Sequence, residues 1–342
     1  MKAATSLPCG RRTMVRLAAI SLLAAGCHRQ SPSPPPQLEV LGRRLESAVG
    51  AVEEHCRSLS ARIRGVYGDL DRLAEAADAD AYVLAENGTL FRPDAIASGR
   101  PAVFVSGVVP VTPDILRVVR ATEAIDPDLE RLVTDNEQVV QAYYNDHHSF
   151  NRIYPPFDVV VQYPPGMNIP EYNFYYLADD AHNPGREPVW VKEPYVDPAG
   201  RGWMISCVAP VHAGGRLEGV CGLDITIDRL VRDLDFDGRN PFYLLLAEDG
   251  TVVATGEAMI QVLRLPPLKN HRYVDTVRSD TFRSAQYNLH KSSSLAIREM
   301  AAEVLAPDAS SALLDLDNRR WAIHVRRIRH LDWRLLAFMP RR

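Results

Sequence analysis

A run of apolar residues spaced by threes and fours begins at Leu38 and continues to Ala77. This spacing places the apolar side chains along one side of an α-helix. About 40 residues at about 1.5 Å each predict a rod roughly 60 Å long. We expect this helix, over residues 38–80, to lie as a spine against globular lobes. The alternative is that it pairs with the same helix of a second copy, which would make a homodimer. The stripe consists of Leu38, Leu41, Leu45, Ala48, Val52, Cys56, Leu59, Ile63, Val66, Leu70, Leu73 and Ala77.

A six-residue segment of the chain occurs twice. Leu84–Thr89 and Leu246–Thr251 are identical at five of six positions and lie 162 residues apart. Each copy joins two apolar runs through Asn-Gly or Asp-Gly, which is a strong sequence signal for a β-hairpin. The repeat predicts that one structural module occurs twice.

The segments that follow each hairpin have the same order, with helical patterns first and antiparallel strands last. This order predicts the α+β class, with two lobes that each consist of an antiparallel sheet flanked by helices. We place the first lobe at 81–235 and the second at 236–342, because a run of Asp, Gly, Asn and Pro between 235 and 241 ends the preceding helix. The expected helices lie near 115–123, 129–136 and 295–305, and the expected strands near 203–210, 216–227, 312–316, 321–329 and 333–339.

The first 27 residues have the pattern of an export signal. Four basic residues precede an uncharged run, Leu17–Ala25, which is too short to span a bilayer. The run ends in small residues before Cys27, an arrangement that resembles a bacterial lipoprotein cleavage site with Cys27 as the lipidated residue. An ordinary signal peptide is the alternative, and both general secretory and twin-arginine export fit the Arg11-Arg12 pair. Residues 28–37 are rich in Pro and Ser and predict an extended linker.

Composition and charge narrow the class of protein. Apolar residues make up 46% and charged residues 24% of the 342 residues, which is typical of a folded globular chain. The net charge of −4 gives no basic field for nucleic acid, so no nucleic-acid partner is expected. Five cysteines in this length do not make a disulfide scaffold.

Four segments between residues 150 and 230 stand in a specific order. They are Arg152–Pro155, Val189–Asp197, Trp203–Val211 and Leu217–Ile225, and the last contains a Gly-Val-x-Gly-x-Asp motif. In this order, and after a long helix, they resemble the double-Cache sensor family, the extracytoplasmic ligand-binding region of many bacterial receptors. The resemblance implies two stacked PAS-like lobes along a long N-terminal helix, with the ligand pocket in the first lobe.

The resemblance also implies which residues bind the ligand. One version of the family grips amino acids with an Arg-x-Trp-Tyr-x-x-Ala helix start, and here Tyr172 replaces the arginine and Phe174 the tryptophan. An arginine is the usual bidentate partner of a ligand carboxylate, so its loss argues against an amino acid unless Arg152 takes over. The expected ligand-binding residues are Arg152, Tyr154, Tyr172, Phe174, Tyr175, Trp190, Tyr195, Asp197 and Asp224.

The residues themselves point to a similar site. The segment 143–197 holds eight of the 13 tyrosines of the chain, and such a cluster suits a pocket for a small organic molecule. Asp197 and Asp224 are candidates to hold an ammonium group beside the tyrosine rings, so an amine-bearing ligand is favoured. The alternative is that the tyrosines pack the sheet and Asp224 only bonds backbone.

Cys207 and Cys221 lie seven residues on either side of Gly214, between two expected strands. If they face each other across the hairpin, the oxidising compartment permits a disulfide. Two free, buried thiols are the alternative.

No catalytic motif or cofactor motif is present, so neither a cofactor nor a metal is expected. His147 and His148 are adjacent and would face opposite sides of a strand, which argues against a shared metal. The sequence lacks the HExxH, GxSxG and P-loop motifs.

We therefore expect a sensor lipoprotein of the bacterial cell envelope, on the periplasmic side or the cell surface, that binds a small ligand. No kinase, cyclase or second hydrophobic span follows the last expected strand, so a separate membrane signalling protein is the expected partner. The alternatives are a periplasmic hydrolase-type enzyme and a structural envelope lipoprotein without a ligand.

Overall fold

The computed structural model describes residues 33–78, 80–196, 203–232, 234, 236, 241–266 and 284–341. The expected lipidation site at Cys27, the expected ligand residue Asp197 and the expected lobe boundary at Asp235 lie outside these residues.

The long helix predicted over 38–80 is present but shorter. It runs as α1 over Pro36–Tyr67, and a separate short helix, α2, follows at Leu70–Ala76. The break falls at Gly68, whose backbone N–H bonds to the Gly65 carbonyl at 3.2 Å, and the Asp69 N–H bonds to the Val66 carbonyl at 3.0 Å. These bonds span three residues rather than four and end the helix. The buried face of α1 is the expected stripe with small shifts, and consists of Leu38, Gly42, Leu45, Val49, Val52, Cys56, Leu59, Ile63 and Val66.

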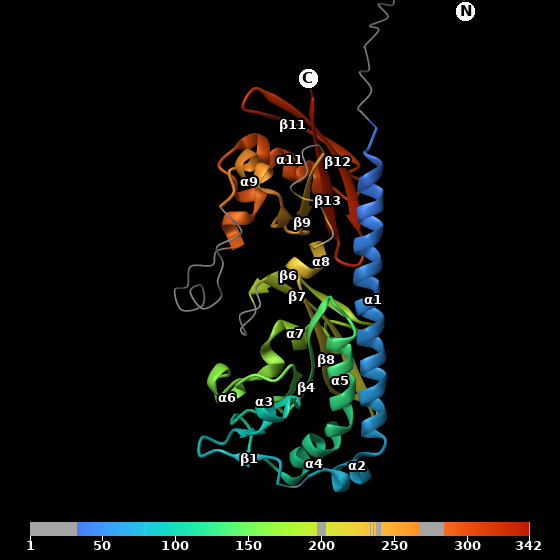
Figure 1. The fold of residues 1–342 in the computed structure, drawn as a ribbon, viewed down its shortest axis with the longest axis vertical. Coiled ribbons are helices and arrows are strands. Elements are labelled where there is room, and N and C mark those ends of the chain that lie inside the picture. Colours follow the sequence, from blue (N-terminus) through green and yellow to red (C-terminus); the bar gives the residue numbers. More distant parts are fainter. Residues whose placement is uncertain are drawn as a thin grey trace, which may run out of the picture. The chain divides into compact units, whose positions relative to one another are not determined.

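An eight-stranded antiparallel sheet forms the first lobe, with strand order β1-β2-β3-β5-β4-β8-β7-β6 (Figure 1). Its strands are β1 (Val83–Leu84), β2 (Leu90–Phe91), β3 (Ala102–Val105), β4 (Val139–Asp146), β5 (Phe150–Tyr154), β6 (Val189–Val196), β7 (Trp203–Ala213) and β8 (Arg216–Thr226).

Helices cover both faces of this sheet. One face packs against α1, α4 (Pro113–Ala121), the 3₁₀ turn η1 (Thr122–Ile125) and α5 (Asp126–Thr134). The other face is covered by α3 (Ala95–Ser98), α6 (Val159–Gln162), η2 (Ile169–Glu171) and α7 (Asn173–Tyr176). Because side chains alternate along a strand, each strand points every second side chain toward the α1 face and the others toward the opposite face.

The second lobe contains a five-stranded antiparallel sheet with order β10-β9-β13-β12-β11. Its strands are β9 (Phe242–Leu246), β10 (Val252–Thr255), β11 (Ser311–Leu316), β12 (Arg319–Ile328) and β13 (Trp333–Arg341). The helices of this part are α9 (Glu257–Leu263), α11 (Leu295–Leu305) and the 3₁₀ turns η4 (Ser284–Tyr287) and η5 (Leu289–Lys291), and α8 (Ile227–Val231) follows the first sheet. The α+β class and the two antiparallel sheets expected from the sequence are confirmed.

The repeated hexamer forms the same turn in both lobes. In the first copy Ala85 N bonds to Thr89 O at 2.9 Å, and in the second Ala247 N bonds to Thr251 O at 2.8 Å. Gly88 and Gly250 have positive φ values of 83° and 89°, which favour glycine. The hairpin predicted from each Asx-Gly pair is confirmed.

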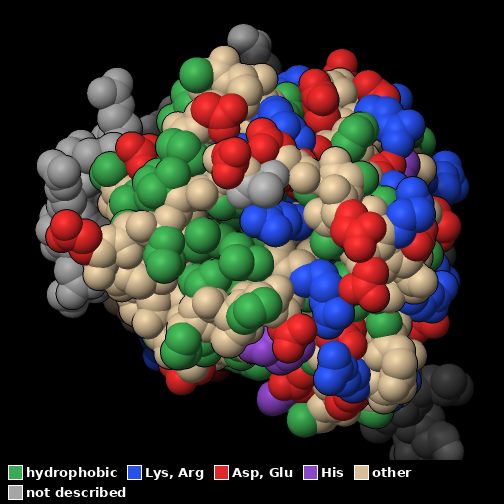
Figure 2. Space-filling model, turned by 90° about the horizontal axis from the view of Figure 1, so that it is seen from below, with side chains coloured by type: hydrophobic (Ala, Val, Ile, Leu, Met, Phe, Trp, Pro, Cys, Tyr) green, Lys and Arg blue, Asp and Glu red, His purple; other side chains and the backbone are tan. Residues whose placement is uncertain are grey.

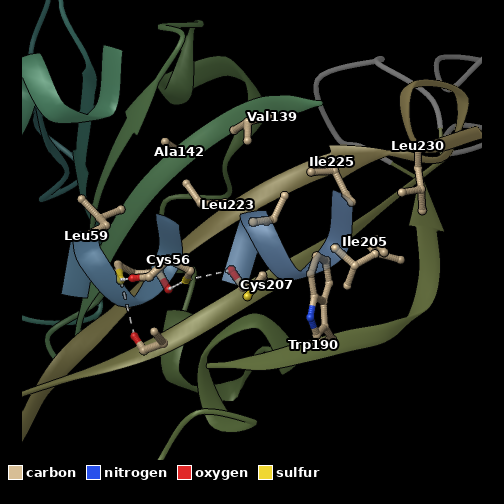
Figure 3. Close-up of a cluster of buried hydrophobic side chains, with 14 of the residues drawn as sticks. Cys56, Leu59, Val139, Ala142, Trp190, Ile205, Cys207, Leu223, Ile225 and Leu230 are labelled. Atoms are coloured by element: carbon tan, nitrogen blue, oxygen red, sulfur yellow. Dashed lines mark hydrogen bonds between the residues drawn. The ribbon is translucent and has the colours of Figure 1, made fainter. Parts of the chain in front are cut away.

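Three cysteines meet where α1 packs against the sheet (Figure 3). Cys56 of α1 lies against β7 and β8, with its Sγ 3.3 Å from the Cys207 carbonyl oxygen. Cys207 pairs in register with Leu223, and Cys221 pairs with Ala209. Of the two alternatives left open by the sequence, the structure has the free thiols. The turn is centred between Gly214 and Gly215, and the pairing shifts by one residue between Val211 and His212, so Cys207 and Cys221 do not face each other.

Candidate functional site

A cavity of about 380 Å³ lies on the face of the first sheet opposite α1. Alternate residues of β4, β5 and β8 form its floor, and residues from the segment 157–174 form its cover. The cavity is lined by Gln141, Tyr143, Asn145, Asn151, Ile153, Phe157, Gln162, Tyr163, Pro164, Met167, Tyr172, Asn173, Phe174, Tyr195, Met204 and Asp224. This volume suits a small organic molecule.

One end of the floor carries a buried carboxylate. Asp224 of β8 is 4% exposed, and its Oδ1 accepts a hydrogen bond of 2.5 Å from the Ser206 hydroxyl on β7. The Tyr195 hydroxyl lies 2.6 Å from Ser206 Oγ and 3.5 Å from Asp224 Oδ1. Gln141 is the residue opposite Asp224 on β4. These side chains hold the carboxylate in one orientation toward the cavity.

The other end of the floor carries two amides. Asn151 Nδ2 donates a hydrogen bond of 2.7 Å to Asn145 Oδ1, and the two residues are register partners on β5 and β4. Gln141 and Asn145 are four residues apart on β4, which separates the amide pair from the carboxylate end by about 13 Å. The floor is therefore polar at both ends.

Aromatic rings form the middle of the cavity. Tyr143 on β4 lies over Gly222 on β8, so closely that a Cβ at Gly222 would come within 2.3 Å of the ring. Phe174 meets Tyr143 edge to face at 6.3 Å and stacks on Tyr172 at 5.2 Å. Burial raises the pKa of the Tyr143 hydroxyl well above its usual value, and the charge of Asp224 raises it further. The Tyr143 hydroxyl therefore stays uncharged in the lining of the cavity.

Four of the expected ligand residues line this cavity, namely Tyr172, Phe174, Tyr195 and Asp224. Tyr175 is not among the lining residues. It is 4% exposed and packs in the apolar cluster behind the cavity wall.

Arg152 and Tyr154 do not reach the cavity, so their expected place in the site is wrong. Arg152 is fully buried on the α1 face of the sheet, where Nη1 donates to Asp126 Oδ1 at 2.6 Å and Nη2 to the Val119 carbonyl at 2.6 Å. Tyr154 packs against the apolar cluster on the same face. The physical reason is strand parity, because Asn151 and Ile153 of β5 face the cavity and their neighbours face away.

Trp190 also lies on the α1 face, and its expected role in the site is wrong for the same reason. Its indole Nε1 donates a hydrogen bond of 2.7 Å to Glu53 Oε1 of α1. Tyr195 reaches the cavity from the same strand because it lies five residues after Trp190, and alternation along a strand places the two side chains on opposite faces. The pairing of β6 with β7 shifts by two residues between Val191 and Tyr195, which leaves these faces unchanged.

The amides of the floor were missed in the sequence. Gln141, Tyr143 and Asn145 alternate with Ala142 and Tyr144 in β4. Polar and apolar residues do not alternate cleanly in β4, because Tyr144 points toward the α1 face and Tyr143 toward the cavity. The alternation that marks a strand was therefore not recognised in this segment.

The described residues that line the cavity include one carboxylate and no Lys, Arg, His or Cys. A carboxylate with aromatic faces around it is the chemistry that recognises an ammonium group.

The sequence matches no protein-family model, and no curated protein matches it. Among solved structures it is similar to the ligand-binding domain of the Pseudomonas fluorescens chemoreceptor CtaA in complex with L-alanine, at 15% identity over 89% of this chain and 94% of that one, with a TM-score of 0.42. The ligand-binding domain of the Pseudomonas aeruginosa PAO1 chemoreceptor PctB in complex with L-Gln is 16% identical over 90% of each chain, with a TM-score of 0.45. That of the Campylobacter jejuni chemoreceptor Tlp3 in complex with 4-methylisoleucine is 9% identical over 90% of this chain and 93% of that one, with a TM-score of 0.42.

All three are described as ligand-binding domains of chemoreceptors. Within the described part of the chain, no helix has both the length and the hydropathy that crossing a membrane requires.

Proposed function

We propose that this protein is an extracytoplasmic sensor that binds a small amine in the cavity of the first lobe. The observation that carries this proposal is the placement of Asp224. Its carboxylate is buried at one end of an aromatic cavity and is oriented by Ser206. A ligand ammonium would place its charge beside this carboxylate and its carbon chain between the rings.

The same lining disfavours a ligand that is held by its carboxylate. The arginine that would grip a carboxylate is replaced by Tyr172, and Arg152 lies on the opposite face, paired with Asp126. The described lining contains no Lys or Arg that would pair with a ligand carboxylate. The amides of Asn145 and Asn151 at the far end of the floor suit an uncharged polar group, so the proposed ligand is an amine with a second polar group.

The surroundings of β6 support a sensor role. This strand brings Tyr195 to the cavity, while Lys192 pairs with Asp332 near the second sheet at 2.5 Å. Trp190 bonds to Glu53 of α1, which also meets His330 Nδ1 at 2.9 Å. A shift of β6 on ligand binding would therefore reach α1 and the second lobe through hydrogen-bonded contacts.

The proposal includes a lipid anchor at Cys27 and a separate membrane signalling protein as partner. The export signal and the cysteine motif at Cys27 support a lipid-anchored envelope protein, which reports to a separate membrane signalling protein. Membrane fractionation tests the anchor: Cys27→Ala is expected to release the protein or leave its precursor unprocessed. Identical fractionation of wild type and variant would contradict lipid anchoring.

The direct test of ligand class is a thermal-shift screen of the purified chain against amines, amino acids, carboxylates and purines. A compound at 100 times its Kd raises the free energy of unfolding by about 2.7 kcal/mol. We expect hits among amines that lack a carboxylate. Hits confined to carboxylates would contradict the proposal, and turnover of a compound would favour the hydrolase alternative.

A further inference from the structure

The turn between β4 and β5 brings Asp146, His147 and His148 together. The expectation that the two histidines face opposite sides of a strand is wrong, because β4 ends at Asp146 and both histidines lie in the turn. Their ring centroids are 3.8 Å apart. Ser149 closes the turn with a positive φ of 61°. A strand would have separated the two imidazoles, whereas the turn puts them side by side.

Asp146 is held rigidly in this turn. Its side chain is 1% exposed, and Oδ1 accepts hydrogen bonds from the backbone of His148 at 2.8 Å and of Phe150 at 2.9 Å. Oδ2 lies 3.4 Å from His148 Nδ1. One carboxylate oxygen therefore shapes the turn, and the other faces an imidazole.

His147 is oriented by the neighbouring strand. Its Nδ1 lies 2.9 Å from the backbone carbonyl oxygen of Glu218 on β8, a bond in which the ring nitrogen donates. This donation leaves the lone pair on Nε2. A histidine that ligates a metal usually makes this bond to a carbonyl or carboxylate with its other nitrogen.

We propose that Asp146, His147 and His148 form a binding site for a divalent transition metal of the Zn²⁺ type. Each residue offers one ligand atom, and the three atoms lie within 4.8 Å of one another. Ligands about 2.1 Å from a tetrahedral Zn²⁺ are about 3.4 Å apart, so the three atoms would have to approach one another by about 1.4 Å at most to close the set. Two imidazoles and one carboxylate suit Zn²⁺ and leave a coordination position for water.

The basic side chain on the neighbouring strand β8 does not compete with a metal ion at the turn between β4 and β5. Arg216 is the nearest basic side chain of β8, and it pairs with Glu218 at 2.7 Å. Arg216 is therefore engaged by a carboxylate other than that of Asp146.

The site is separate from the ligand cavity but adjoins it. None of the three residues lines the cavity, yet Asn145 and Asn151 flank the turn and belong to the cavity floor. Ser149 Oγ accepts a hydrogen bond of 3.0 Å from the backbone of Ile169 in η2, which covers the cavity. A metal would brace this end of the floor, and the inference does not depend on which ligand the cavity takes.

Titration of the full-length chain with Zn²⁺, in competition with a chromophoric chelator, tests the proposal. We expect one site whose affinity falls at least tenfold in the double variant His147→Ala/His148→Ala. Asp146→Asn keeps an oxygen for the turn and should also weaken binding. With Co²⁺ as probe, the wild type should show a visible absorption band that the double variant lacks.

The matched control is the double variant His182→Ala/His212→Ala. These histidines also contact aspartates, Asp179 and Asp180, at 2.8 and 2.9 Å, but among the described residues neither pair belongs to a group of three possible metal ligands. Zn²⁺ affinity should stay at the wild-type value in this control. Equal affinity of the wild type and the His147→Ala/His148→Ala variant, or an equal loss in the control, would overturn the proposal.

Discussion

Ser206 donates a hydrogen bond of 2.5 Å to Asp224, and the two residues are direct register partners on β7 and β8. The next pair along the same strands, Cys207 and Leu223, faces α1 (Figure 3). A single residue step therefore separates the charged end of the cavity from the core beneath α1. The carboxylate is oriented by the sheet itself, so its position does not depend on the cover of the cavity.

Gly222 makes room for the ring of Tyr143. A Cβ at this position would lie 2.3 Å from the ring carbon that bears the hydroxyl. We expect Gly222→Ala to push the ring into the cavity, to lower the free energy of unfolding by about 1–3 kcal/mol and to weaken ligand binding. Chemical denaturation and calorimetric titration measure the two effects. Gly214→Ala is not a suitable control because its φ is positive, at 57°, whereas Gly166→Ala has space around it and should change neither quantity.

Arg152 has a structural role, and its replacement tests that role. Arg152→Met would leave the Asp126 carboxylate buried without its closest partner, which typically costs about 3–5 kcal/mol in the free energy of unfolding. Ligand affinity should stay unchanged, because Arg152 lies on the opposite face of the sheet. Arg100→Met is the matched control. Arg100 also pairs with Asp126, but it is 43% exposed and should cost less than about 1 kcal/mol. If folded Arg152→Met bound the ligand more weakly than the wild type, Arg152 would have a role in ligand binding and this prediction would be wrong.

Cys207 and Cys221 should behave as free thiols. Burial raises the pKa of the Cys221 thiol well above its usual value, so the native protein should react slowly with thiol reagents. After unfolding without reductant, the wild type should show two more reactive thiols than Cys207→Ala/Cys221→Ala. No difference between them would mean that the two cysteines form a disulfide.

The periodicity of the sequence was sufficient to predict the helices and strands, but not to predict which face of each strand points toward the cavity. The stripe from Leu38 predicted α1, and the Asx-Gly repeat predicted both hairpins. The end of the helix at Gly68 was missed because the apolar spacing continues through Leu70 into α2. Apolar spacing shows which side of a helix is buried, but it does not reveal the two-residue turn of Gly68 and Asp69 between the helices.

The site could be predicted only in part, for a reason that Arg152 illustrates. A period of two says that Arg152 and Asn151 face opposite sides of β5, but it does not say which side holds the cavity. The pairing of β5 with β4 decides this, and pairing is a long-range property. The same holds for β6, where the period of two puts Trp190 and Tyr195 on opposite faces but does not say which of them faces α1.

Exposed apolar side chains mark the first lobe. Val83, Leu84, Ile96 and Val161 are each more than 40% exposed. Figure 2, which views the molecule from below, shows apolar side chains gathered over one area, with charged side chains of both signs over another.

Calorimetric titration of wild type and Asp224→Asn with the best amine from the screen tests the central claim most directly. Asp224→Asn keeps the size of the side chain and removes the charge that would pair with the ammonium. Asp180→Asn is the control, because Asp180 is half exposed and lies outside the cavity lining. We expect Asp224→Asn to lose about 2–5 kcal/mol of binding free energy, and Asp180→Asn to lose none. Equal affinities of wild type and Asp224→Asn would contradict the account and would make Asp224 a structural residue.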